Sequence, residues 1–304
     1  MKICILGVGK MGGALAAGIA RGSGRDFGTQ CQNPEGREPS GTIGKGNVAK
    51  LVLCDHSHAK AAALARKIGA RVAKTAKEAV DGADAIIIAV KPDATSALLE
   101  EIRKDLGETL IISVVAGLPM SYFKKRVPRS CRVALIMSNL AVQIGKGTTM
   151  YFAESHIDAR EIEALLAPTG VLIRARKEED IDFAMLTGSG MAFFLAAIEG
   201  MAKAGEKHGL TYAQALTLAA KAADGASALV LEKEISPLDL EKMVATEKGI
   251  TLHGLRILRK ANVRHNFHLA AHAVIKEAKR RRQFCETKLR PFEPQAQIGR
   301  KKNR

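Results

Sequence analysis

Residues 2–22, "KICILGVGKMGGALAAGIARG", decide the fold. The first part, "KICILGV", is apolar over most of its length and is typical of a short buried strand. Small residues follow in "KMGGALAAGIARG", which lets a helix pack closely on a sheet. Gly7, Gly9 and Gly12 stand between the two in the spacing G-x-G-x-x-G. There the first glycine makes the turn, the second lets the backbone approach a pyrophosphate, and the third brings helix and strand together. The segment predicts a dinucleotide-binding loop.

Strand and helix patterns alternate through the first half of the chain. Apolar strands are expected at residues 2–8, 50–55, 84–90, 109–117 and 132–137, and helices at 10–22, 57–69, 94–106 and 121–127. Strands that are apolar along their whole length are covered on both faces, as in a parallel sheet with helices on each side. The pattern predicts an α/β Rossmann domain over residues 1–154.

The second half carries helical spacing instead. Strand signals fade from about Ser155, and "SP" at Ser236-Pro237 is a typical helix start. We expect an all-helical domain over residues 155–283 that buries its apolar faces against a second copy of the chain. A basic tail without regular structure is expected over 284–304. The Gly- and Pro-rich segment 22–47 is expected to be an irregular insertion, and its purpose stays open.

Composition excludes several classes of protein. Of 304 residues, 47% are hydrophobic and only 4% aromatic, so a large aliphatic core is expected. The five cysteines never form a C-x-x-C pair, which argues against a disulfide framework or a zinc site and favours a reducing cytosol. Uninterrupted apolar runs stay shorter than the ~18 residues of a membrane span, so neither membrane contact nor a location outside the cytoplasm is expected.

The net charge of +16 raises the question of nucleic acid. Much of the excess lies in residues 279–304, where lysines and arginines gather beside few apolar residues. A solvated tail is the favoured interpretation, and non-specific contact of this tail with RNA is the alternative.

Asp55 ends the second strand, where an acidic residue in this fold hydrogen-bonds the adenosine ribose and disfavours a 2′-phosphate. It lies much further from Gly12 than the usual ~20 residues, so its place on the strand, rather than the spacing, supports the role. His56, Ser57, His58 and Lys60 follow directly and are suited to a phosphate, while Ser57 alone is suited to cap a helix. The choice between NADH and NADPH therefore stays open.

Five further motifs come in a fixed order along the chain. They are "AVKP" at 89–92, "VVAG" at 114–117, "MSN" at 137–139, "LTGSGMAFF" at 186–194 and "VATEKGITLHGLRIL" at 244–258. Together with the glycine loop they resemble the pyrroline-5-carboxylate reductase family, from Met1 to about Arg282. The resemblance implies a Rossmann domain and a helical dimerisation domain that interlocks with its partner's in dimers or larger rings. It also implies reduction of the cyclic imine 1-pyrroline-5-carboxylate to L-proline with NADPH or NADH.

The resemblance assigns residues to cofactor and substrate. Cofactor contacts are implied for Leu6, Gly7, Val8, Gly9, Lys10 and Met11, for Ala89, Val90, Lys91 and Pro92, for Ala116, Gly117 and Leu118, and for Asn139; Gly12 and Asp55 join them from the motif itself. Substrate contacts are implied for Ser189, Gly190, Thr246, Lys248, Gly249 and Ile250. The hydroxyl of Thr251 is placed at the ring nitrogen, where it would hydrogen-bond the amine that forms.

The departures from the family pattern gather at the substrate end. Met191 and Phe193 replace a proline and a tyrosine after the Gly188–Gly190 segment, which we expect to be a tight turn that brings backbone close to nicotinamide and substrate. Thr246, Glu247 and Lys248 stand where the family has "SPG", so the backbone nest for a carboxylate is altered. Three functions stay open: the reductase itself, a paralogue acting on another cyclic imine or keto compound, and a non-catalytic dinucleotide-binding dimer.

Two other chemistries are weaker. His253, His265, His268 and His272 lack an acidic ligand at matching helical spacing, so no metal site is expected. Ser189 lacks the strand-to-helix setting of a hydrolase nucleophile.

Overall fold

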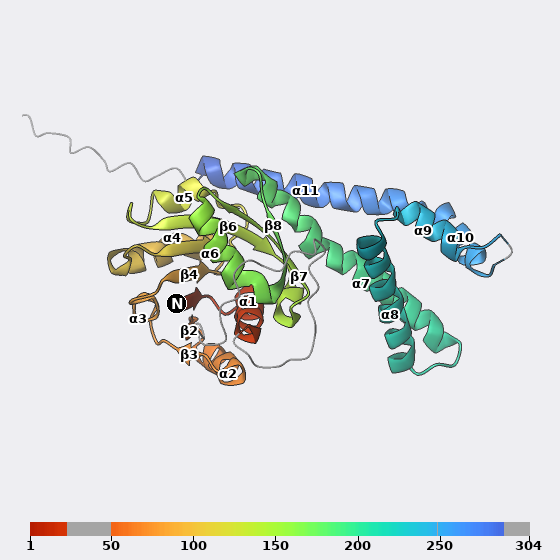
Figure 1. Ribbon diagram of the computed structural model, residues 1–304, viewed down its shortest axis with the longest axis horizontal. Coiled ribbons are helices and arrows are strands. Elements are labelled where there is room, and N and C mark those ends of the chain that lie inside the picture. The colour runs from red at the N-terminus through yellow and green to blue at the C-terminus, as the bar shows by residue number, and fades with distance from the viewer. Residues whose placement is uncertain (23–49, 248, 289–304) are drawn as a thin grey trace, which may run out of the picture.

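The computed structural model describes residues 1–22, 50–247 and 249–288, and it shows an α/β domain from which a helical arm extends (Figure 1). This arrangement confirms the expected fold class, a Rossmann domain followed by a helical domain. The insertion expected at 22–47 lies outside the described residues except for Gly22.

The α/β domain is built on one eight-stranded sheet with the order β3-β2-β1-β4-β5-β6-β7-β8. The strands are β1 (Lys2–Leu6), β2 (Lys50–Cys54), β3 (Arg71–Val72), β4 (Ala85–Ile88), β5 (Leu110–Ser113), β6 (Arg132–Ser138), β7 (Gly147–Ala153) and β8 (Gly170–Arg174). The first six are parallel, β7 is antiparallel to β6, and β8 is parallel to β7. The order reverses between β1 and β4, which opens the crevice where this fold takes its ligand.

Helices cover both faces of the sheet because successive strand side chains point to opposite sides. Ile3 and Ile5 of β1 join one core cluster, and Cys4 and Leu6 join the other. The first cluster is covered by α1 (Lys10–Arg21), α2 (His58–Ile68) and α6 (His156–Leu166). The second is covered by α3 (Ala76–Val80), α4 (Pro92–Ile102) and α5 (Met120–Lys124).

The expected domain boundary after residue 154 is too early. The α6 helix packs on the sheet, and β8 pairs with β7 in register from Gly147↔Gly170 to Tyr151↔Arg174. The sheet therefore continues to residue 174. The β8 strand was not predicted because it is a half-exposed edge strand that runs directly into the charge-rich segment 174–180.

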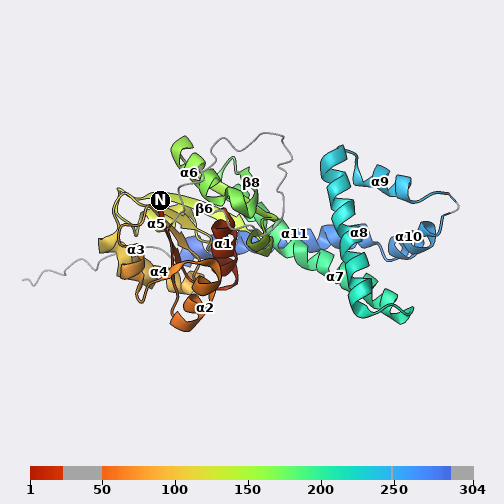
Figure 2. The ribbon, with the colours of Figure 1, turned by 60° about the horizontal axis from the view of Figure 1, so that its bottom comes forward.

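The helical arm begins after the 3-10 turn Glu178–Ala184. It contains α7 (Met185–Lys207), α8 (Tyr212–Lys233), α9 (Pro237–Val244), α10 (Thr251–Lys260) and α11 (Val263–Lys288). Helices α7 and α8 pack against each other, and α11 runs back alongside α7 to the α/β domain (Figures 1 and 2). Residues 284–288, expected to belong to an irregular tail, are helical, because the backbone of α11 continues to Lys288.

Large apolar side chains are exposed along the whole arm. Phe194 is 61% exposed, Leu231 65%, Met243 66% and Ile257 71%. Exposed apolar surface of this extent marks an interaction site. Within the described part, residues 178–207 are long and apolar enough to cross a membrane by length and composition, with only 17% of the apolar window buried. A helix that packs against a second chain has the same features, and α8 to α10 share its exposed apolar surface.

Candidate dinucleotide and substrate site

The glycine loop connects β1 to α1 and is shaped by backbone contacts. Gly7 has φ +94°, and its N–H donates to the Cys54 carbonyl at 2.8 Å. A Cβ at Gly7 would lie 2.8 Å from the Ala89 carbonyl carbon, and one at Gly12 would lie 2.0 Å from the Gly7 oxygen. Side chains at these two positions are excluded by the fold itself, as the motif predicts.

Gly9 differs, because a Cβ there would meet nothing within 4 Å. It is the N-cap of α1, and no side chain caps that helix. The first-turn amide groups of α1 therefore face open space with partial positive charge, which suits a pyrophosphate. The residues of this loop fit a dinucleotide.

The Asp55 carboxylate contacts the glycine loop. Its Oδ2 accepts the Val8 N–H at 2.6 Å, its Oδ1 accepts the Ser57 N–H at 2.9 Å, and His56 Nδ1 lies 3.0 Å from the same Oδ1. The side chain is 5% exposed. Each carboxylate oxygen thus accepts one backbone amide, and the expected ribose contact stays a prediction. Ser57 is the N-cap of α2, but its side chain makes no cap hydrogen bond.

The other expected cofactor segments follow neighbouring strands at the same edge of the sheet. Ala89 N–H donates to the Leu6 carbonyl at 2.8 Å, which joins the end of β4 to the end of β1. Pro92 is the first residue of α4, and Lys91 is its N-cap. Gly117, after β5, has φ +82°. Asn139, after β6, uses its Oδ1 to accept the Ala141 N–H at 3.1 Å, and its side-chain amide nitrogen has no hydrogen bond within the described residues.

The Gly188–Gly190 segment lies inside α7, so the expected tight turn is wrong. Tertiary packing overrides the helix cost of two glycines here. A Cβ at Gly188 would lie 3.9 Å from the Ser138 carbonyl, so α7 crosses the end of β6 beside the cofactor edge. Met191 and Phe193 lie on the same helix, and the Phe193 ring packs edge-on against Phe267 of α11 at 6.2 Å. The half-buried Phe193 side chain therefore joins α7 to α11 within the arm.

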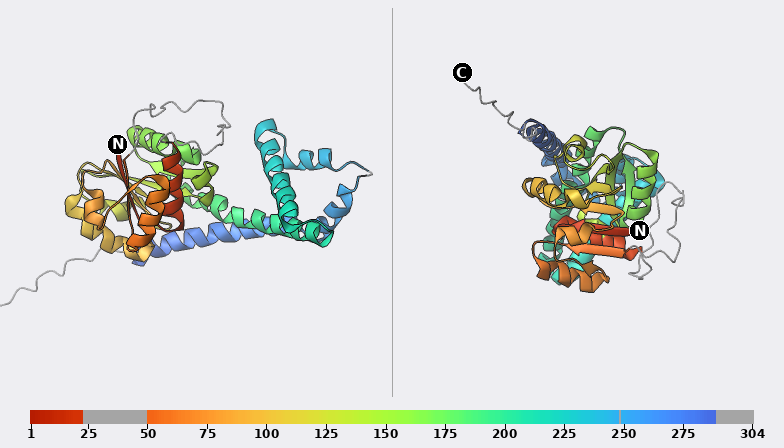
Figure 3. Two further views of the ribbon diagram at one scale, coloured as in Figure 1. Left: turned by 90° about the horizontal axis from the view of Figure 1, so that it is seen from below. Right: turned by 90° about the vertical axis from the view of Figure 1, so that its left-hand side faces the viewer.

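The expected substrate residues of the second motif are far from this edge within one chain. Thr251 begins α10, at the end of the arm that lies away from the α/β domain (Figure 3). Thr246, Gly249 and Ile250 precede it, and the Ile250 side chain is 90% exposed. Lys248 lies outside the described residues. Ser189 and Gly190 follow Gly188 on α7, which lies beside the end of β6, whereas Thr251 lies at the far end of the arm.

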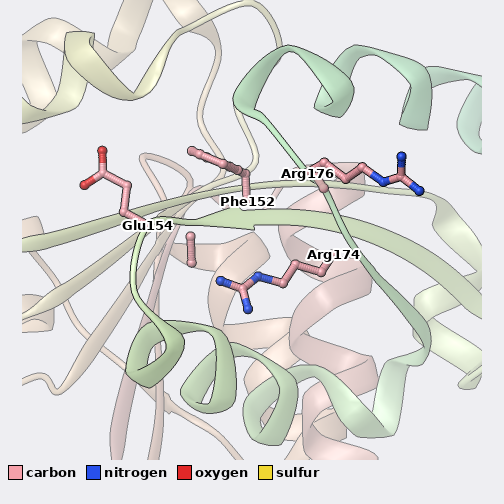
Figure 4. Close-up of a pocket in the computed structure, with 6 residues that line it drawn as sticks. Phe152, Glu154, Arg174 and Arg176 are labelled. Atoms are coloured by element: carbon pink, nitrogen blue, oxygen red, sulfur yellow. The ribbon is translucent and has the colours of Figure 1, made fainter.

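A shallow pocket on the domain surface is lined by Phe152, Glu154, Arg174 and Arg176 (Figure 4). It lies at the ends of β7 and β8. Because β7 runs antiparallel to β6, this is the sheet edge opposite the glycine loop. Figure 4 shows the two arginine side chains pointing away from each other, so they do not converge on one ligand.

The histidines of α11 form a row instead of a cluster. The His265 and His268 rings lie 6.4 Å apart, and those of His268 and His272 lie 6.3 Å apart, both stacked. Across the described residues, no group of three or more His, Cys, Asp or Glu side chains is arranged to hold a metal ion.

Comparison with known proteins adds to this geometry. Residues 2–117 match a family model described as "NADP oxidoreductase coenzyme F420-dependent", and residues 178–281 match one described as "Pyrroline-5-carboxylate reductase dimerisation". Together with the glycine loop Gly7–Gly12, which we call the glycine cradle, these matches define the chain as an NAD(P)H-dependent oxidoreductase with a helical dimerisation domain.

Along almost its whole length, the chain is similar to pyrroline-5-carboxylate reductases. The reductase of Methanosarcina acetivorans is 29% identical over 287 residues, covering 93% of this chain and 97% of the relative. The Aquifex aeolicus reductase is 27% identical, covering 86% and 89%. The structure of the Streptococcus pyogenes reductase superposes with a TM-score of 0.72 at 25% identity, covering 92% of this chain and 98% of that one. The Plasmodium falciparum reductase, solved with NADP bound, shares the fold with a TM-score of 0.77 at 23% identity, covering 93% and 98%.

Proposed function

We propose that this chain reduces 1-pyrroline-5-carboxylate to L-proline with NADPH or NADH. The observation that carries the proposal is the pairing of a cradle for a dinucleotide with an apolar arm of the reductase dimerisation type. The cradle holds a reduced nicotinamide dinucleotide, and the arm brings in the residues that meet the imine. Relatives along almost the whole chain carry the reductase name.

Residues along the carboxyl edge of the sheet would hold the cofactor. The Gly7–Gly12 loop takes the pyrophosphate, and Ala89–Pro92, Ala116–Leu118 and Asn139 line the path of the nicotinamide. When bound, the reduced nicotinamide supplies a hydride to the imine carbon.

Polar groups of the chain itself would bind and orient the substrate. We assign Ser189 and Gly190 of α7 and the loop of Thr246, Lys248, Gly249 and Ile250 to the substrate carboxylate. The Thr251 hydroxyl hydrogen-bonds the ring nitrogen and orients the proton that the nitrogen takes up as the carbon–nitrogen double bond becomes single. Because Thr251 lies at the far end of the arm, it serves the glycine loop of a second chain. The active unit is a homodimer or a larger homo-oligomer.

We place the reaction in the cytoplasm, in line with Cys4, Cys54 and Cys131, which form no disulfide within the described residues, and an apolar arm suited to self-association. Contact of the basic tail with RNA stays a prediction, because residues 289–304 lie outside the described part of the chain.

A second candidate is a reductase for another cyclic imine or a keto compound. Met191, which replaces the family's proline, lies half-buried on α7 near the cofactor edge and favours a reshaped substrate wall. A panel of cyclic imines and 2-keto acids separates the two functions.

The test is direct. Purified protein is mixed with 1-pyrroline-5-carboxylate and either NADPH or NADH, and the loss of reduced-nicotinamide absorbance is followed while proline is measured by mass spectrometry. Equal amounts of oxidised cofactor and proline support the proposal. Tight cofactor binding with no proline formed contradicts it, and turnover of another panel member then selects the second candidate.

A further inference from the structure

A buried arginine closes the base of the helical arm. Arg282, on the returning helix α11, donates from Nε to Asp182 Oδ2 at 3.0 Å and from Nη2 to Asp182 Oδ1 at 3.2 Å. Its Nη1 donates to Glu178 Oε1 at 2.8 Å. Only 8% of the Arg282 side chain and 7% of the Asp182 side chain are exposed. The contact joins residues 100 to 104 positions apart, the start and the end of the arm.

The geometry of these hydrogen bonds fixes the direction of α11 as well as its contact with the turn Glu178–Ala184. A buried guanidinium needs acceptors for its N–H groups. Because the group is planar, it donates two parallel hydrogen bonds to a carboxylate in only one orientation. Apolar packing alone would let α11 slide or rotate on the domain. The three bonds to Asp182 and Glu178 instead hold α11 in one register against the turn that starts the arm.

The same network reaches the cofactor edge. Glu178 Oε1, which accepts from Arg282, also accepts the Met120 backbone N–H at 3.0 Å. Met120 begins α5, two residues after the Ala116–Leu118 segment. On the other side of that segment, a Cβ at Gly117 would lie 3.6 Å from the Arg281 backbone carbon. The end of α11 therefore braces the loop between β5 and α5 from two sides.

We propose that Arg282 is a positioning residue that sets both the direction of the arm and the conformation of the 116–120 loop. It does not touch substrate or cofactor. It acts through Glu178 on the loop and through α11 on the arm that carries Thr251 to the partner chain. We call the contacts of Arg282 with Asp182 and Glu178 the clamp. Its role in catalysis rests on the proposed function, whereas the clamp itself does not.

The experiment compares Arg282→Met with Arg280→Met in the full-length oligomer. Arg280 is a matched control, because it lies on the same helix but is exposed, and among the described residues it pairs with Glu277 alone. Peptide-level hydrogen exchange is measured over residues 117–124 and 178–184, together with oligomer mass, the NADPH dissociation constant, and kcat and KM for 1-pyrroline-5-carboxylate. Arg282→Lys, which keeps the charge but loses the fork, serves if the methionine variant does not fold.

Arg282→Met is expected to speed exchange at least about tenfold in these two segments, without matching change in the β1 and β4 strands. The KM for the imine should rise more than kcat falls, and Arg280→Met should resemble the wild type. Arg282→Lys should fall between them. Exchange that is equal in Arg282→Met and Arg280→Met overturns the clamp, as does a uniform increase over the whole chain. If no variant, wild type included, reduces the imine, the proposed function fails, and the exchange data still decide the clamp.

Discussion

The backbone N–H of Val8 donates to Asp55 Oδ2 at 2.6 Å, across 47 residues of sequence. The bond ties the glycine loop after β1 to the end of β2. A second amide, that of Ser57, occupies the other oxygen. Asp55 therefore holds the glycine loop and the start of α2 in place through its two oxygens.

Asp55→Asn tests this role. An asparagine keeps one acceptor oxygen and loses the other, so we expect the free energy of unfolding to fall by about 1–3 kcal/mol. If bracing the loop is the main role of Asp55, the ratio of the KM values for NADPH and NADH should stay the same, because both oxygens already accept backbone amides. Asp93→Asn, at the exposed start of α4, is the control. A large shift of the ratio toward NADPH would restore the ribose contact and contradict the bracing role.

Two glycines of the loop should respond differently to alanine. Gly12→Ala places a Cβ against the Gly7 carbonyl, so we expect a loss of about 1–3 kcal/mol in folding stability. Gly9→Ala meets only open space in the protein, so it should fold normally but bind NADPH at least about tenfold more weakly. Thermal unfolding and fluorescence titration of NADPH measure the two effects. Gly107→Ala, also in open space but away from the loop, should change neither. Unaltered NADPH affinity in Gly9→Ala would show that the pyrophosphate does not bind at this position.

The apolar arm should hold the oligomer together. Leu231→Glu puts a charge on α8 at a side chain that is 65% exposed in the single chain. If a partner covers it, the charge loses water on association, and the molar mass measured by light scattering should fall toward that of a monomer. Ile157→Glu, at a side chain 69% exposed on α6 of the α/β domain, should leave the mass unchanged. Equal masses for both variants would place the interface elsewhere.

The buried Tyr151 hydroxyl predicts a loss of stability in alkali. Burial and its hydrogen bond to Glu163 raise the pKa of Tyr151 above its usual value. A phenol whose pKa is raised by folding contributes stability below its unfolded pKa of about 10, and this contribution is lost as the pH rises beyond that value. Tyr151→Phe should therefore show a shallower fall in melting temperature between about pH 9 and pH 11 than the wild type. Parallel curves for the two proteins would show that Tyr151 is not the titrating group.

The local sequence pattern was sufficient to predict those parts of the fold that depend on residues adjacent in sequence. The β1–loop–α1 unit is an example, because the strand, the three glycines and the helix are adjacent in sequence. The β8 strand was missed because its partner β7 and its edge position, rather than its own residues, make it a strand. Gly188 and Gly190 are helical although glycine disfavours a helix, and the contact of α7 with the end of β6 beside Gly188 cannot be read from the local sequence.

Some site residues could also be predicted from local sequence, whereas others depend on contacts between distant segments. The glycine cradle follows from spacing, but the partner of the Asp55 carboxylate depends on how two strand ends meet. Arg282 was counted with the basic residues of a solvated tail, since nothing in its own neighbourhood in sequence points to Glu178 and Asp182 about a hundred residues earlier. The place of Thr251 depends on a second chain.

The central claim is that a complete site takes its glycine loop from one chain and Thr251 from another. Gly9→Ala and Thr251→Ala chains, each nearly inactive alone, can be co-expressed with different tags, and the mixed dimer isolated by two affinity steps. Its proline formation should reach about half the wild-type rate, because one of its two shared sites then carries both native residues. A mixed dimer as inactive as either parent would contradict the claim, because it would place Thr251 and the glycine loop in the same chain's site.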